Sequence, residues 1–126
     1  MEPYASIQVA AVLFGVAAMG GLLMAGMRFK GIPQPPAWLA MVHGLLAAAG
    51  LTLLIYAALM VGLPSMALLG TGVFVLAGIG GAVMNLLFHC KQLPLPIPLM
   101  VAHALVAVSG FVLLLLSLYQ PQHASY

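Results

Sequence analysis

The sequence predicts an all-α integral membrane protein, a four-helix up-and-down bundle built from a tandem two-helix repeat. Three observations predict this fold class: the composition, four long apolar stretches and a repeated histidine motif. Hydrophobic residues make up 65% of the 126 residues and charged residues only 3%. A chain of this composition belongs in a bilayer, and the apolar stretches leave no room for a soluble domain. Residues 1–126 are therefore expected to form a single transmembrane domain.

Prolines and the few charges divide the chain into four stretches, each long enough to span a bilayer, which requires about 20 mainly apolar residues. The predicted spans run from about Ser6 to Arg28, Ala37 to Leu63, Met66 to His89 and Pro98 to Tyr119. The chain starts with Glu2 and no positive charge, so the first span is expected to be a mature helix rather than a secretory signal. The polar tail with His123 is expected to be solvated.

The basic residues predict the orientation of the bundle. Arg28, Lys30 and Lys91 lie in the first and third connections, which are on the same side of a four-span bundle. Basic loops favour the cytoplasmic side of a membrane. We therefore expect a bacterial inner-membrane protein with cytoplasmic basic loops and both termini outside. Cys90 is the only cysteine, and it is expected to be a free thiol.

A histidine motif that occurs twice indicates the internal repeat. Both copies have a histidine, an alanine four positions later and a glycine seven positions later, all on one helix face. The matched residues are His43, Ala47, Gly50, His103, Ala107 and Gly110. The first unit covers about residues 5–62 and the second about 66–120. Because each unit crosses the membrane twice, the copies have the same orientation and the two histidine helices are parallel.

The spacing of prolines and histidines predicts that both histidines lie at the same depth. His43 follows Pro36 by seven positions, and His103 follows Pro96 by seven. A helix rises about 1.5 Å per residue, so each imidazole lies ~10 Å from the inner end of its helix. Two glycine pairs lie ~11 to 13 Å from the same boundary by the same rise. They are Gly20, Gly21, Gly80 and Gly81.

Histidine inside a membrane span is costly and by default indicates function. The second and fourth helices of such a bundle are expected to be diagonal, roughly 11 to 14 Å apart. A metalloporphyrin that takes one neutral imidazole on each face would fill this gap. The small residues of the motif would give clearance above and below the ring, and the glycine pairs would admit its edge. Arg28, with Lys30 and Lys91, would lie near the propionates.

This pattern resembles small four-helix b-type cytochromes of membranes, which hold haem b between paired histidines with glycines beside the ring. His43, His103 and their small neighbours carry the resemblance. It implies one haem b per chain and electron transfer, without an autonomous enzyme activity. It also implies a place in a membrane redox complex or a homo-oligomer, with quinone as a candidate partner. A single symmetric histidine pair does not support two haems.

Two other interpretations of the histidines remain open. In the first, the protein is a cofactor-free structural or assembly subunit, and each imidazole bonds to a carbonyl or hydroxyl group. Thr52 and Ser109 are candidate hydroxyl partners. In the second, a magnesium tetrapyrrole such as chlorophyll or bacteriochlorophyll is bound by single histidines.

The remaining residues exclude several function classes. Glu2 is the only carboxylate, which argues against proton-coupled cation export. No catalytic triad, phosphate-binding loop, HExxH motif or basic nucleic-acid surface is present. His89 and Cys90 could bind Cu(I) with sulfur from nearby methionines. An interfacial histidine and a free thiol are the favoured interpretation of these two residues.

Overall fold

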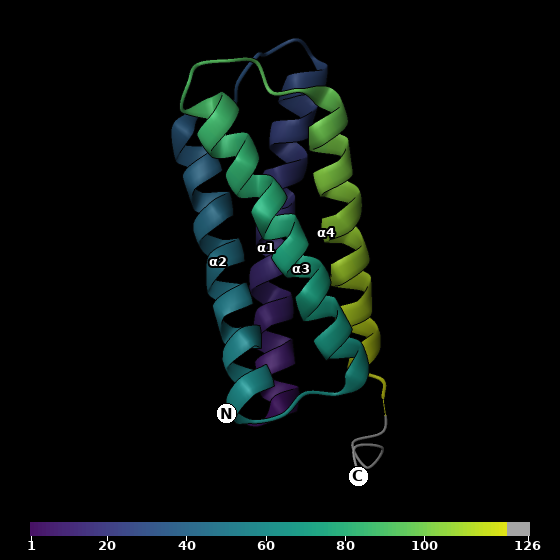
Figure 1. The fold of residues 1–126 in the computed structure, drawn as a ribbon. Helices are drawn as coiled ribbons and strands as arrows, with labels where there is room; N and C mark the ends of the chain where they lie inside the picture. The colour runs from purple at the N-terminus through teal and green to yellow at the C-terminus, as the bar shows by residue number, and fades with distance from the viewer. Residues whose placement is uncertain (121–126) are drawn as a thin grey trace.

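The computed structural model describes residues 1–120, and these form four helices that run alternately up and down (Figure 1). The helices are α1 (Pro3–Phe29), α2 (Ala37–Met60), α3 (Ser65–Met84), which continues into the π-helical turn η1 (Asn85–His89), and α4 (Ile97–Ser117). No strand occurs among the described residues. The predicted fold class is confirmed, and the helix ends differ from the predicted ones by only a few residues. The tail with His123 lies outside the described residues.

Prolines begin all four helices. Pro3 lies in the first turn of α1, while Pro36, Pro64 and Pro96 directly precede α2, α3 and α4. Proline suits a helix start because its fixed φ is helical and because the N–H that it lacks has no partner there. These positions therefore divide an almost continuous apolar sequence into separate helices.

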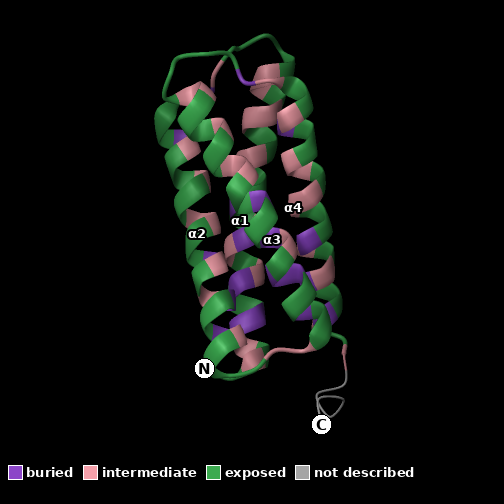
Figure 2. Ribbon diagram, in the orientation of Figure 1, coloured by how far each residue is buried: buried purple, intermediate pink, exposed green. Residues whose placement is uncertain are grey.

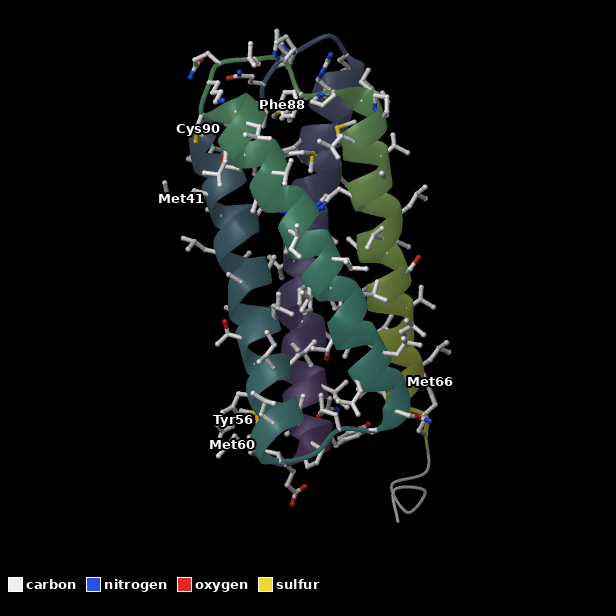
Figure 3. All side chains as sticks on the ribbon, viewed as in Figure 1. Met41, Tyr56, Met60, Met66, Phe88 and Cys90 are labelled. Carbon is white, nitrogen blue, oxygen red and sulfur yellow. The ribbon has the colours of Figure 1, made fainter. Side chains whose placement is uncertain are left out.

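The outside of the bundle is apolar along its length. Large side chains such as Leu22, Leu59 and Leu105 are exposed on α1, α2 and α4, and Figure 3 shows Met41 and Tyr56 on the outer side of α2. All four spans, with η1 counted in the third, are long and apolar enough to cross a membrane. An apolar surface of this extent is stable in lipid, where the helices satisfy their own backbone hydrogen bonds.

The main core lies in the half of the bundle that holds the chain termini (Figure 2). Its centre is a parallel stack of Phe14 from α1 and Phe74 from α3, with ring centroids 3.8 Å apart and an interplanar angle of 2°. Glycines make room for both rings. A Cβ on Gly50 would lie 3.0 Å from Phe14, and one on Gly110 would lie 3.3 Å from Phe74. We call this half the phenylalanine half.

The loops at the other end of the bundle are joined across the two repeat units. The Leu95 backbone N–H donates to the Pro33 carbonyl at 3.2 Å, and the Gln34 side chain donates to the Leu93 carbonyl at 2.8 Å. Arg28 Nε donates to the Leu95 carbonyl at 2.9 Å. These three contacts, here called the loop clasp, tie the ends of the two units together.

The π-helical turn places one extra residue at the end of the third span. The Cys90 N–H bonds to the Asn85 carbonyl, five residues back. The left-handed residue that ends the first span is Gly31, with φ 95°, and its counterpart after η1 is Gln92, with φ 58°. These two are 61 positions apart, whereas the histidines are 60 apart. The second loop is one residue shorter, so the spacing of 60 positions between the two histidines is kept.

Candidate functional site

The structure brings His43 and His103 together. They project from α2 and α4, which are diagonal in the bundle. Helix α2 packs mainly against α1 and less against α3, and α4 packs mainly against α3 and less against α1. Their ring centroids are 6.3 Å apart, and the ring planes are inclined by 73°. The two helices are diagonal, as expected. Both imidazoles point into the bundle, so the rings are much closer together than the helix axes.

Each imidazole donates a hydrogen bond to a backbone carbonyl of the preceding helix. His43 Nδ1 lies 2.7 Å from the Ala17 oxygen, and His103 Nδ1 lies 2.9 Å from the Ala77 oxygen. A carbonyl only accepts, so both Nδ1 atoms carry the proton and both Nε2 atoms keep a lone pair. Neutral imidazole with a free Nε2 is the form that binds metals, and a carbonyl is a common partner for the other nitrogen.

The two acceptor carbonyls were not identified from the sequence. Ala17 and Ala77 lie four residues before Gly21 and Gly81, on the same helix face. Their recurrence 60 positions apart, in step with the histidines, is the signal that could have found them. Thr52 and Ser109, the candidate hydroxyl partners, instead bond to carbonyls of their own helices.

Each glycine pair lies beside one of the imidazoles. A Cβ on Gly21 would lie 3.0 Å from His43 Cε1, and a Cβ on Gly81 would lie 3.3 Å from His103 Cε1. At Gly20 and Gly80 a Cβ would be in ordinary contact, at 3.8 and 3.7 Å from the nearest atoms. The room at these glycines, expected from the sequence to admit a cofactor edge, is therefore used by the histidine rings.

The other expected site residues also have different contacts. Gly50 and Gly110 lie against Phe14 and Phe74, within the phenylalanine half. Ala47 is half-buried and packs against the core of that half, and Ala107 is half-buried as well. Arg28 is bonded to the Leu95 carbonyl in the loop clasp. Sequence spacing placed these residues on the correct helix face but did not identify their partners.

The separation of the rings fits one metal ion between them. A metal–imidazole bond is about 2.0–2.1 Å and a ring nitrogen lies about 1.1 Å from its ring centre, so two imidazoles opposed across one metal have centroids about 6.2–6.4 Å apart. The observed value is 6.3 Å. The inclination of 73° is compatible with this arrangement, since each ring can turn about its own metal–nitrogen bond.

The histidine layer is less tightly packed than the phenylalanine half. His43 and His103 are half-buried, as are the four glycines around them. Within residues 1–120, no buried side-chain nitrogen or oxygen lacks a hydrogen-bond partner. The Nε2 atoms, for which the structure shows no hydrogen bond, are therefore not sealed inside the protein.

Two other places in the bundle are separate from this site. His89 and Cys90 lie at the loop end, where Cys90 is exposed (Figure 3). Among the described residues, no group of three or more His, Cys, Asp or Glu side chains could hold a metal ion. A cavity of about 420 Å³ lies near the termini, lined in part by Ile7 and Gln120. Ile7 is ~21 Å from Gly21 along α1 at the helical rise.

The fold and the site together define a class: a four-helix membrane protein with two neighbouring histidines inside the bundle. Comparisons with protein-family models, with curated proteins and with solved structures found no match. The chemistry of the histidine pair and its surroundings is therefore what indicates a function.

Proposed function

We propose that this protein binds one haem b between His43 and His103 and acts as an electron-transfer subunit within the membrane. The observation that supports this most is the pair of neighbouring imidazoles, with centroids 6.3 Å apart and each Nδ1 bonded to a backbone carbonyl. His43 and His103 would both serve as ligands of the haem iron. Such ligation favours transfer of single electrons over oxygen chemistry.

The protein's own groups would hold and orient the cofactor. The Ala17 and Ala77 carbonyls fix the ring orientation and the tautomer of the two histidines. The phenylalanine stack closes the bundle toward the termini, and the loop clasp ties its other end. The bound haem would supply a one-electron iron couple, and the apolar helices would keep bulk water away from it.

We further propose that the loops with Arg28, Lys30 and Lys91 face the cytoplasm of a bacterial cell, with the protein in its inner membrane. The histidine layer then lies in the cytoplasmic half of the bilayer. One haem at this depth does not carry an electron across the whole membrane. The protein would therefore exchange electrons with a quinone or with another subunit of a redox complex, or act as a homo-oligomer.

A cofactor-free structural or assembly subunit is the second candidate. The carbonyl bonds of His43 and His103 favour it, because they already give each imidazole a partner inside the bundle. Packing alone, however, does not require two rings to face each other at a separation that matches a shared metal. The separation of the two rings is therefore the reason that the haem proposal is preferred.

The deciding experiment is a visible absorption spectrum of the detergent-purified protein, expressed with adequate haem supply, before and after reduction with dithionite. We expect a sharp α band of six-coordinate haem b and about one haem per chain. Colourless protein would overturn the proposal and favour the structural subunit. Pigment extraction from the same sample would reveal a magnesium tetrapyrrole, which would make the histidines chlorophyll ligands instead.

A further inference from the structure

The glycines beside the imidazoles differ in how closely they approach the rings. Gly21 and Gly81 present bare backbone to His43 and His103, and a Cβ there would meet the Cε1 atoms at 3.0 and 3.3 Å. Cε1 is bonded to both ring nitrogens, so this contact is next to the Nδ1–H that donates to Ala17 or Ala77. The neighbouring Gly20 and Gly80 leave ordinary contact distances.

We propose that Gly21 and Gly81 are positioning residues that hold the two histidines in the Nδ1-protonated form, with Nε2 free to bind the haem iron. This inference rests on the proposed function and names two residues that control the ligands of that site. Their contribution is the absence of a side chain, which lets each ring reach the carbonyl one turn back on the neighbouring helix.

The geometry explains why a methyl group at these positions would disturb the ligands. A contact of 3.0 Å is tighter than nine in ten real Cβ contacts, so in Gly21→Ala the ring of His43 must move away by a few tenths of an ångström. A ring pushed away from α1 lengthens its hydrogen bond to the Ala17 carbonyl, now 2.7 Å, and weakens the hold on the Nδ1 proton. Loss of such an outer partner typically lowers metal affinity 10- to 100-fold.

The same distances predict a graded series. Gly21→Ala should have the largest effect and Gly81→Ala a smaller one, whereas Gly20→Ala and Gly80→Ala should have little effect. If the glycines instead admitted a cofactor edge, all four substitutions would be expected to matter. Gly26→Ala is a matched control on α1, because nothing lies within 4 Å of its added Cβ. Every variant gains the same helix propensity, so the series compares contacts alone.

The first measurement uses the full chain purified without haem and labelled with ¹⁵N-histidine. The ¹⁵N shifts report which ring nitrogen carries the proton. We expect His43 and His103 to be Nδ1-protonated in the wild type and in Gly26→Ala. We expect Gly21→Ala to weaken this signal for His43 only, and Gly81→Ala to weaken it less, and only for His103. Unchanged tautomers in both variants would overturn the inference.

The second measurement is a haem titration of the same proteins in detergent. We expect Gly21→Ala to bind haem about 10- to 100-fold more weakly than Gly26→Ala, and Gly81→Ala to lie between them. Equal affinities of Gly21→Ala and Gly26→Ala would overturn the ligand role of the glycine. A wild-type protein that binds no haem would instead overturn the proposed function, and the ¹⁵N shifts would still decide whether these glycines set the tautomer.

Discussion

The phenylalanine half and the histidine layer are two solutions to the same problem, an aromatic pair that faces across the centre of a membrane bundle. Phe14 and Phe74 stack directly, with centroids 3.8 Å apart and nearly parallel planes. His43 and His103 face each other at 6.3 Å with inclined planes, and each has used only its Nδ1 in a hydrogen bond. The first pair completes its contacts within the protein, and the second pair retains an acceptor nitrogen on each ring.

The difference shows how a repeat can separate stability from chemistry. In both pairs, each ring lies against a glycine, and the two glycines are 60 positions apart. They are Gly50 and Gly110 for the phenylalanines, and Gly21 and Gly81 for the histidines. The helices exchange roles between the two pairs, because α2 and α4 supply the glycines for the phenylalanines while α1 and α3 supply those for the histidines. The apolar rings are buried against each other, whereas the imidazoles are half-buried and each uses one ring nitrogen in a hydrogen bond.

Removal of either histidine should have the largest effect of all, and this effect should be on haem binding. We expect His43→Ala and His103→Ala each to abolish the six-coordinate haem spectrum, because both ligands are required for it. The measurement is haem content per chain together with the reduced spectrum. His89→Ala is the control, since His89 lies in η1 at the loop end, and it should keep both. Normal six-coordinate haem in either of the first two variants would refute the site.

Loss of a stacked phenylalanine should act on stability and not on the ligands. We expect Phe14→Ala to lower the free energy of unfolding by about 3 kcal/mol, the lower end for buried phenylalanine, since lipid provides no transfer term between helices. Unfolding in mixed detergent and SDS measures this value. Phe29→Ala, at a position 62% exposed, should change it little. Loss of haem from folded Phe14→Ala would mean that the two pairs are not independent.

The sequence predicted the features that depend on spacing along a helix. The four spans and the depth of both histidines follow from proline positions and the helical rise, and the structure has the spans where they were expected. The partners of the glycines could not be predicted in this way, because the rotation of each helix decides which ring meets Gly21 or Gly50. The Ala17 and Ala77 carbonyls could not be predicted as partners, because every residue has a backbone carbonyl and the side chain does not show which one accepts.

A methyl group added beside the phenylalanine stack should lower the free energy of unfolding by less than the loss of a phenylalanine does. In Gly50→Ala the new Cβ would lie 3.0 Å from Phe14, and overpacking of this kind typically costs about 1–3 kcal/mol. We expect a loss of about 2 kcal/mol in SDS unfolding with an unchanged haem spectrum. Gly44→Ala, where the added Cβ meets nothing within 4 Å, is the control on the same helix. Equal stabilities of the two variants would contradict the tight packing of this half.

Loss of the Arg28 hydrogen bond in the loop clasp should have the smallest effect on stability. Two substitutions of Arg28 distinguish a role in this hydrogen bond from a role beside the haem propionates. Arg28 Nε donates to the Leu95 carbonyl, whereas the sequence suggested a contact with haem propionates. Lysine keeps the positive charge but lacks this N–H, so Arg28→Lys and Arg28→Ala should both lower the free energy of unfolding by about 1 kcal/mol, the usual value of one hydrogen bond. Haem content should stay the same in both variants. If Arg28→Ala loses haem and Arg28→Lys retains it, the charge of Arg28 acts on the cofactor, and the histidine layer extends to the loop end of the bundle.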